Sequence, residues 1–438
     1  MTQATIRNLD SPTAEADAEA AAFRKVSWRL MPFLMLCYVV AYLDRVNVGF
    51  AKLQMLADLH LSDTVFGFGA GIFFFGYFLF EVPSNIILHK VGARVWIARI
   101  MITWGLISGA CVFASGPISF YILRFLLGAA EAGFFPGVIL YLTYWYPSRY
   151  RGKIVAMFMA AIPVSGLIGG PLSGAIMDYL AGSAGWAGWQ WMFVIEAVPA
   201  LLIGIATLLY LDNSVRAAGW LSEGEKRIVE RAVAADSETA QEHASLGQLF
   251  ADPRVWLMSL IYFCCVVGQY GLTFWLPTLI KSAGVQGALN IGLLTAIPYG
   301  TAVVAMILFG LSADRQRERR WHLAIPMLLG AAGLVGSAFA AQNTVLALAF
   351  LSVAAAGVLT SAPLFWSFPT AFLAGISAAA GIAAINSVGN LAGFASPYMI
   401  GWVKDATGST DIAMYVLAAV LIAGAGLALS VPARLVNR

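Results

Sequence analysis

The sequence predicts an all-α membrane protein with twelve transmembrane helices in two six-helix bundles. The 438-residue chain is 60% hydrophobic and only 11% charged, with a mean hydropathy of +0.80, which excludes a soluble globular protein. It contains twelve apolar runs, each long enough to cross a bilayer as a helix. The two halves also repeat each other at an offset of about 225 residues, as expected for a pair of related bundles.

The apolar runs fall into two groups of six. Those of the first bundle, 29–211, cover 29–50, 65–87, 94–114, 118–145, 153–180 and 189–211. Those of the second bundle, 254–432, cover 254–280, 289–312, 322–341, 345–367, 374–402 and 412–432. The polar segment 212–253 predicts a partly helical cytoplasmic connector. Residues 1–28 and 433–438 are expected to be cytoplasmic tails, because the N-terminal segment lacks the apolar core of a signal peptide.

The positions of lysine and arginine predict the orientation in the membrane. With the N-terminus in the cytoplasm, the cytoplasmic segments hold 21 of these residues, whereas the outer loops hold only Lys52, Lys281 and Lys404. Cytoplasmic loops of membrane proteins carry such an excess. We therefore expect both termini on the cytoplasmic side of a multi-pass protein.

The internal repeat is clearest in the fifth and eleventh runs. Residues 170–178, from Gly170 to Asp178, match residues 396–405, from Ser396 to Asp405. Parallel repeats of six spans imply two bundles related by an axis along the membrane normal, with a ligand site between them near mid-depth.

Two charged residues, Arg124 and Glu131, lie inside the fourth run. Charges at membrane depth are costly and normally face a bundle interior or a wet cavity. Their spacing places both on one helix face roughly 10 Å apart, close enough to share a substrate or exchange a proton. Gly128 and Gly133 permit close helix approach, and Pro136 predicts a bend. The alternative is an ion pair that only holds two helices together.

The first run contains a second charged pair, Asp44 and Arg45. Neighbours on a helix point about 100° apart, so at most one of them faces a cavity squarely. Arg45 presents a planar fork that matches a carboxylate, and we predict that it anchors the substrate, the alternative being a pair with Asp44 or Glu131. Asp44 and Glu131 are the predicted proton carriers. Protonating either acid would free positive charge on Arg45 or Arg124, so that proton and anion favour each other's binding.

The second half has no charged residue in a span interior between Lys281 and Lys404; charges there gather around the 314–320 loop. We expect this half to supply neutral groups for the remainder of the ligand. The candidates are Gln269, Tyr270, Trp366, Asn386 and Asn390. Among the remaining buried acids, Glu81 is interpreted as a gate or helix contact and Glu196 as a structural group.

Other classes of function find little support. The four cysteines lie in apolar runs without a CxxC or Cys/His pattern, so we expect no disulfide and no metal. No nucleophile–base set or phosphate loop is present, which argues against an enzyme, and nothing suggests contact with nucleic acid.

Residues 25–435 resemble the major facilitator superfamily. The segment 310–320 resembles its cytoplasmic loop signature, which implies a gating role for Asp314 and Arg315. The first-half copy departs from the signature, since Leu88 or His89 stands where an aspartate is usual. The fourth-span motif Arg124-xxx-Gly128 also resembles the superfamily pattern.

The segment Ala41-Tyr42-Leu-Asp44-Arg45-Val-Asn47, together with Phe365-Trp366, resembles the anion:cation symporter family, and bacterial tartrate-, hydroxyphenylacetate- and phthalate-type permeases look nearest. The resemblance implies an acid pair for proton coupling, an arginine for the substrate carboxylate, and no cofactor beyond the proton. It also implies a monomer in the bilayer of the bacterial inner membrane. The residues that match its substrate positions are Tyr42, Arg45, Tyr77, Arg124, Trp366 and Asn386.

The sequence thus predicts proton-coupled uptake of a small organic anion by alternating access. Pro363 and Phe365 stand where the sugar-acid branch has hydroxylated residues, which favours a compact dicarboxylate or an aromatic acid. An anion exchanger or uniporter on the same scaffold is the first alternative. A membrane sensor that binds the anion without transporting it is the second, although the connector leaves little room for a signalling domain.

Overall fold

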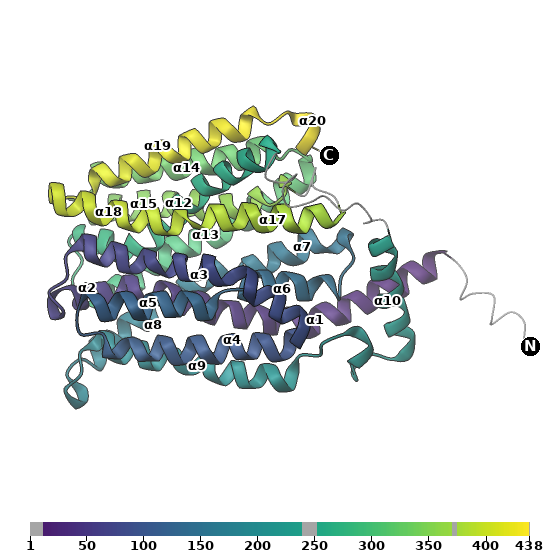
Figure 1. Cartoon of the computed structure of the whole chain (residues 1–438). Coiled ribbons are helices and arrows are strands. Elements are labelled where there is room, and N and C mark those ends of the chain that lie inside the picture. Colours follow the sequence, from purple (N-terminus) through teal and green to yellow (C-terminus); the bar gives the residue numbers. More distant parts are fainter. Residues whose placement is uncertain (1–11, 239–251, 370–374, 438) are drawn as a thin grey trace, which may run out of the picture.

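The computed structural model describes residues 12–238, 252–369 and 375–437, and all regular structure in these ranges is helical (Figure 1). The first half contains α1 (Pro12–Val46), α2 (Val48–Asp58), α3 (Asp63–Val91), α4 (Ala93–Ala110), α5 (Pro117–Glu131), α6 (Phe134–Thr143), α7 (Ser148–Met159), α8 (Ala161–Tyr179) and α9 (Gly188–Tyr210). The connector contains α10 (Glu223–Glu238). The second half contains α12 (Pro253–Ser282), α13 (Ala288–Gln316), α14 (Arg320–Phe339), α15 (Thr344–Phe365), α17 (Gly375–Asn390), α18 (Ala392–Thr407), α19 (Asp411–Ser430) and α20 (Ala433–Val436).

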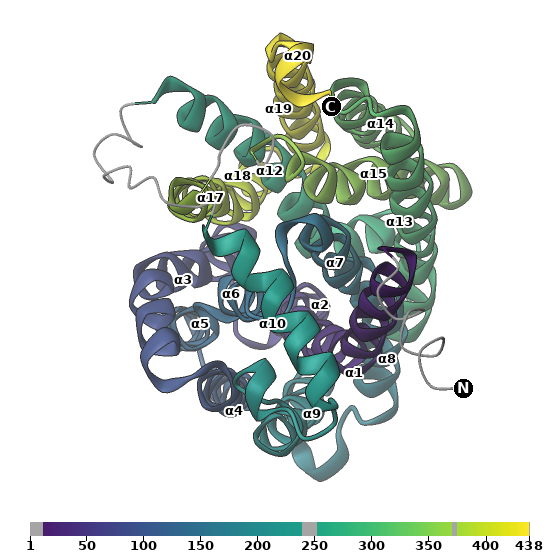
Figure 2. The same cartoon turned by 90° about the vertical axis from the view of Figure 1, so that its right-hand side faces the viewer.

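These helices form two bundles that lie side by side, one from each half of the chain (Figure 2). Among the described residues, eleven segments are long and apolar enough to cross a membrane. The remaining predicted span, 374–402, corresponds to α17 and α18, two 16-residue helices that meet at Leu391. The fold class predicted from the sequence is therefore confirmed.

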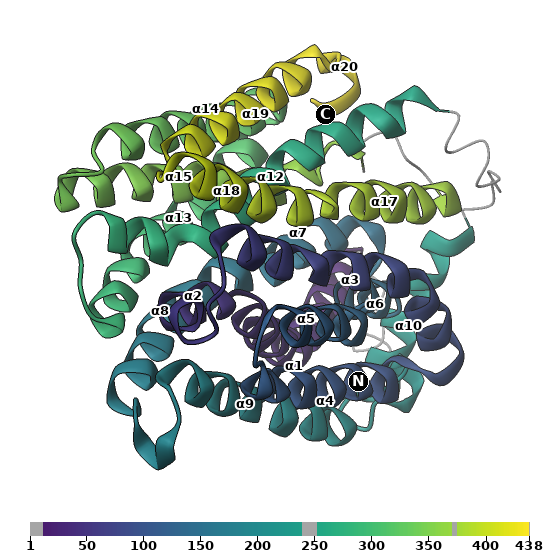
Figure 3. The same ribbon diagram turned by 60° about the vertical axis from the view of Figure 1, so that its left-hand side comes forward.

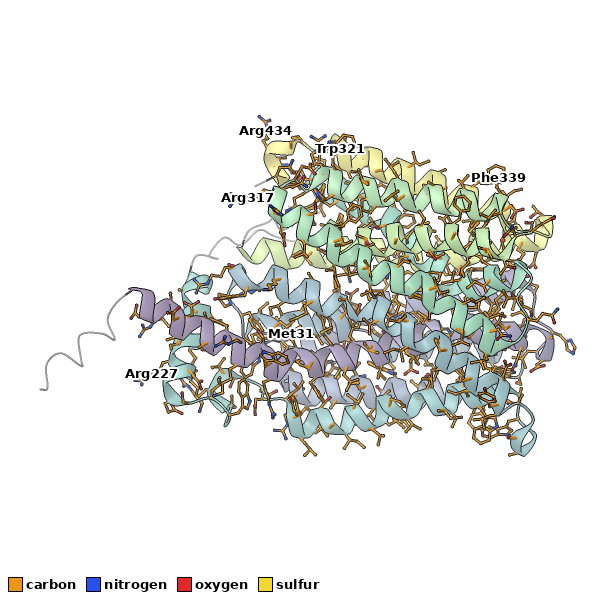
Figure 4. The ribbon with its side chains drawn as sticks, turned by 180° about the vertical axis from the view of Figure 1, so that it is seen from behind. Met31, Arg227, Arg317, Trp321, Phe339 and Arg434 are labelled. Atoms are coloured by element: carbon orange, nitrogen blue, oxygen red, sulfur yellow. The ribbon has the colours of Figure 1, made fainter. Side chains whose placement is uncertain are left out.

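The two ends of the molecule differ in charge and in chain connections. Residue 12, residue 437 and α10 lie at one end, which we call the terminal face (Figure 1). Figure 4 places Arg227, Arg317 and Arg434 at this face and Phe339 at the other end, which we call the opposite face. The predicted orientation would make the terminal face cytoplasmic.

The first predicted span, 29–50, corresponds to a helix that begins earlier and ends earlier, α1 (Pro12–Val46). Helix α1 already begins at Pro12, so part of the expected flexible tail is helical. Phe23 of this segment is buried and packs on Tyr146 and Tyr150, while Lys25 pairs with Glu225 of α10 at 2.8 Å. Apolar contacts with the first bundle and an ion pair with the connector therefore order a segment whose composition indicated a loose tail.

The fourth predicted span is broken into α5 and α6, and the break is not where the sequence predicted it. The chain turns at Gly133, whose φ of 85° is a left-handed conformation that favours glycine. Pro136 instead lies in the first turn of α6, where a missing N–H costs no intrahelical hydrogen bond. The break leaves Glu131 as the last residue of α5.

Two seams of helix contact join the halves. In the α3 seam, α3 runs antiparallel to α18 and the end of α17 (Figure 3). In the α8 seam, α8 runs against α13 (Figure 2). Glycines permit both close approaches: Gly71 packs on the backbone of Phe394, and Gly174 packs on that of Ala288. The glycines of the fifth predicted span, 153–180, thus serve helix packing.

Candidate functional site

A cavity lies between the two bundles and encloses about 470 Å³ of partly open space. Six of the predicted substrate residues line it, namely Arg45, Tyr77, Gln269, Tyr270, Asn386 and Asn390. The remaining lining residues are largely aromatic and apolar, and they were not among the predicted site residues. They include Tyr38, Phe74, Phe135, Met159, Ile162, Tyr262 and Val266.

Arg45 contributes the guanidinium of this cavity from the last turn of α1. Its Nη2 forms an ion pair with Oε1 of Glu131, and its Nη1 donates to the hydroxyl of Tyr270 in the second half at 2.8 Å. Its Nε has no hydrogen-bond partner among the described residues. Arg45 thus joins both halves at the cavity and retains a donor that a ligand could use.

Asp44 points away from the cavity, as the 100° rotation between neighbours allows. Its carboxylate accepts hydrogen bonds from Trp104 Nε1 at 2.9 Å and from Ser108 Oγ at 3.2 Å, both on α4. It is 1% exposed and has no ion-pair partner among the described residues. The structure therefore does not pair Asp44 with Arg45, which was one alternative for that arginine.

Arg124 is the most unusual group near the site. It is fully buried on α5, and none of its guanidinium nitrogens has a hydrogen-bond partner in the part of the chain that the structure describes. Its guanidinium lies 5.2 Å from the ring centroid of Phe73 and does not line the cavity. The expected cluster, in which both acids neutralise both arginines, is therefore wrong in this state, since only Arg45 and Glu131 are paired.

Two further predicted residues lie just behind the cavity wall. The Tyr42 hydroxyl accepts a hydrogen bond from Nε2 of Gln269 at 2.8 Å, which links the two halves. The ring of Trp366 packs against Tyr262, with ring centroids 4.9 Å apart. Tyr42 and Trp366 therefore support lining residues but are not among the residues that line the cavity.

Like Asp44, the buried acids Glu81 and Glu196 accept hydrogen bonds from neutral donors only, among the described residues. Glu81 of α3 accepts from Asn386 Nδ2 at 2.8 Å and from Ser387 Oγ at 3.1 Å, both on α17 in the other half. Glu196 of α9 accepts from Ser173 Oγ at 2.6 Å and from Asn47 Nδ2 at 3.0 Å, both within its own half. The first contact spans the interface between the halves, and the second does not.

At the opposite face, each half supplies an aspartate to a helix N-terminus of the other half. Asp405 of α18 accepts from the backbone N–H groups of Asp63 and Thr64 at 3.1 and 2.7 Å. Asp178 of α8 accepts from those of Ala288 and Leu289 at 3.1 and 2.8 Å. We call these the reciprocal caps. They hold the first turns of α3 and α13 and close the two seams at this face.

The α3 seam carries additional charge beside its cap. Asp63 pairs with Lys52 of its own half at 2.7 Å and with Lys404 of the other half at 3.1 Å. The Lys52 ammonium also lies 3.0 Å from the ring centroid of Trp275 on α12. From the sequence, Lys52 and Lys404 were predicted only as outer-loop charges. An ion pair between segments far apart in the chain leaves no pattern in the local sequence.

The predicted gating residues, Asp314 and Arg315, lie in the last turn of α13 at the terminal face. Asp314 is exposed and pairs with Arg319 at 3.2 Å, and Arg315 is exposed as well. Glu318 anchors the same loop. Its burial raises the pKa of its carboxyl, but hydrogen bonds from the Trp321 N–H and the His322 side chain outweigh this and hold the pKa below its usual range. No described ion pair joins this loop to the first half, whereas the reciprocal caps join the two halves at the opposite face.

The arrangement can hold an anion between the halves. The first half supplies a guanidinium whose counter-ion is a carboxylate, and the second half supplies neutral donors from Gln269, Asn386 and Asn390. A ligand carboxylate has the same chemistry as the Glu131 carboxylate that Arg45 now binds. The described residues contain no group of His, Cys, Asp and Glu side chains suited to a metal ion.

Comparison with known proteins places this geometry in context. Residues 34–397 match the Major Facilitator Superfamily. The chain is 48% identical to "Putative metabolite transport protein NicT" of Pseudomonas putida, over 95% of this chain and 96% of the relative. It is 51% identical to a "Putative tartrate transporter" of Agrobacterium vitis, over 94% and 92%. A crystal structure of a D-xylose-proton symporter superposes with a TM-score of 0.73 at 19% identity, over 93% and 98% of the two chains, and shares the fold.

Proposed function

Because the chain belongs to the Major Facilitator Superfamily, and is therefore a transporter and not an enzyme, we propose that it is a proton-coupled symporter that takes up a small organic anion by alternating access. The observation that carries the proposal is the Arg45–Glu131 pair at the cavity. A buried arginine that already binds a carboxylate has the geometry to bind another, provided its present partner is neutralised.

Proton coupling follows from that exchange of partners. Protonation of Glu131 removes the counter-charge of Arg45 and leaves a buried cation that an incoming anion stabilises. Without the anion, the buried unpaired charge is costly, so proton and anion bind best together. Asp44, which Trp104 and Ser108 hold in the neighbouring α1–α4 contact, is the second proposed proton carrier. Arg124, unpaired and buried, is proposed to pair with the Glu131 carboxylate once Glu131 has released its proton while Arg45 binds the anion.

The proposed substrate is a compact organic acid, with tartrate as its first test case. Relatives at 50–51% identity are named as tartrate transporters, and the cavity combines one guanidinium with amide donors from the other half. The aromatic lining also accommodates a ring-bearing acid. We propose that the terminal face is cytoplasmic in the bacterial inner membrane, and that the protein works as a monomer.

The proposal is tested with purified protein in liposomes that contain a pH-sensitive dye. Tartrate, galactonate, phthalate, 4-hydroxyphenylacetate and glutamate are added outside in turn. Symport acidifies the interior with at least one acid, and protein-free vesicles stay unchanged. Labelled uptake without acidification contradicts symport and favours the exchanger or uniporter.

Two variants divide the roles within the pair. Arg45→Ala removes the anchor and is expected to lower uptake roughly 100-fold or more, because breaking a buried pair costs about 3–5 kcal/mol. Glu131→Gln keeps the size of the side chain but cannot ionise, so it is expected to retain counterflow and lose proton-driven accumulation. Accumulation by the Glu131→Gln protein would exclude Glu131 as the required coupling site.

A further inference from the structure

Glu81 contacts the second half at the edge of the substrate cavity. The α3 seam begins at the opposite face, where Asp405 caps α3, and the Glu81 contact with Asn386 and Ser387 lies at its other end. Glu81 is 3% exposed and has no ion-pair partner among the described residues. A buried carboxylate is held here entirely by an amide and a hydroxyl from the opposite bundle.

The Asn386 amide and the Ser387 hydroxyl together form a binding site for a carboxylate. Asn386 also lines the cavity, beside Arg45 and Asn390. The amide that now binds Glu81 is therefore a group that a substrate anion in the cavity would use. Its Nδ2 lies 2.8 Å from Glu81 Oε1, the distance of a charge-assisted hydrogen bond, so a substrate that takes over this N–H gains it at the expense of Glu81.

We propose that Glu81 is an internal competitor of the substrate, whose carboxylate occupies the Asn386 and Ser387 donors in the empty carrier and yields Asn386 when the anion enters. This inference rests on the proposed function, since it takes Asn386 as a substrate contact. Glu81 acts through Asn386 and is therefore a positioning residue. It ties loading of the site to the joint between α3 and α17, because the same bonds hold the two halves together.

The α8 seam shows that this contact is not a requirement of helix packing. The α8 seam uses no carboxylate beyond its cap among the described contacts, and its packing of Gly166 on Tyr299 matches that of Gly393 on Phe74 in the α3 seam. Glu196 shows that burial alone does not create the competition, since its two donors, Ser173 and Asn47, do not line the cavity. Of these two acids, Glu81 is therefore the one with the competing role, because its donor Asn386 lines the cavity.

The test is equilibrium binding of the same five anions to purified protein by isothermal titration calorimetry at constant pH. Glu81→Ala removes the competitor and is expected to lower the Kd about tenfold. Ser387→Ala removes one donor that holds Glu81, leaves the residues that line the cavity intact, and is expected to lower the Kd about threefold. Glu196→Ala is the matched control and is expected to leave the Kd unchanged.

A merely structural role for Glu81 predicts the reverse, namely weaker or unchanged binding in both Glu81→Ala and Ser387→Ala. That result overturns the inference, and it leaves the proposed function standing if Arg45→Ala abolishes binding. Ser387→Ala deletes only a hydroxyl and reports on the inference even if the Glu81→Ala protein is not monodisperse. Failure of every anion to bind the wild-type protein overturns the proposed function and this inference with it.

Discussion

The α3 seam and the α8 seam close the opposite face with the same backbone contact but surround it differently. In each, an aspartate from one half accepts two N–H groups from the first turn of a helix in the other half. The α3 seam adds the Lys52–Asp63–Lys404 ion pairs at this face and the Glu81 contact at its other end. The α8 seam consists largely of glycines against backbone, with Gly170 and Gly174 on Gly292 and Ala288.

This difference separates the tasks of the two seams. The caps are common to both, and their residues, Asp178 and Asp405, are equivalent in the internal repeat. They therefore represent what the fold needs for closure. Charged groups beyond the caps occur on the α3 seam only, among the described residues, and that seam also borders the cavity through Asn386. We infer that the α8 seam is a steric contact, whereas the α3 seam also responds to charge.

The steric character of the α8 seam is tested most strongly at Gly174. A methyl group added there would lie 2.9 Å from the Ala288 carbonyl carbon, so Gly174→Ala forces the helices apart. Overpacking costs about 1–3 kcal/mol, or roughly 5- to 150-fold in the population of the closed state. Distances between spin labels on the exposed residues Tyr179 and Phe339 at the opposite face should lengthen. Gly300→Ala is the control, since its methyl meets Leu167 at an ordinary 3.7 Å, and an equal effect there would contradict the steric account.

The equivalence of the reciprocal caps is tested by removing each one. Asp178→Ala and Asp405→Ala should each cost about 0.5–2 kcal/mol, the usual value for a lost cap, and shift the same label distances to a similar extent. Raising the ionic strength should then affect the wild-type α3 seam more than the α8 seam, because only the former carries described ion pairs and its Lys404–Asp63 pair is partly exposed. A much larger effect of Asp178→Ala than of Asp405→Ala would show that the two caps do not contribute equally to closure of the opposite face.

The smallest effect is expected away from both seams, at the Lys25–Glu225 pair of the terminal face. The hydrogen bond from Lys25 holds the pKa of the Glu225 carboxyl below its usual range. Its stabilising contribution is thus present above the unfolded pKa of about 4.3 and is lost as the pH falls through the lower folded value. Because the pair is partly exposed, Glu225→Gln should cost at most about 1 kcal/mol near neutral pH. Thermal unfolding at pH 7 and pH 4 checks this, and an equal cost at both values would contradict it.

The large-scale fold could be predicted because it depends on averages over many residues. Span length, composition and the 225-residue repeat each sum a weak signal along the chain. Arg45 could be chosen over Asp44 as the cavity residue from its chemistry, and the cavity indeed contains Arg45. The break at Gly133 was missed because a proline signals a bend more obviously than one glycine among many, although only the glycine has a positive φ.

Contacts between distant segments could not be predicted in the same way. Asp178 and Asp405 were recognised as equivalent positions, but their role depends on which helix N-terminus each one meets. Arg124 was expected to be neutralised within a cluster with Arg45 and the two acids, whereas the structure leaves it against Phe73. A single sequence contains no information on which partner a buried charge has in one state of a moving protein.

The reciprocal caps also bear on how fast the carrier can turn over. The four N–H groups that they hold lie at the first turns of α3 and α13, at the opposite face, where water can reach them when the halves part. Replacing a protein acceptor by water changes the free energy little, so opening this face does not require breaking hydrogen bonds in hydrocarbon. The barrier to reorientation then arises from separating the glycine-packed helices, and the empty and loaded carriers should share most of it.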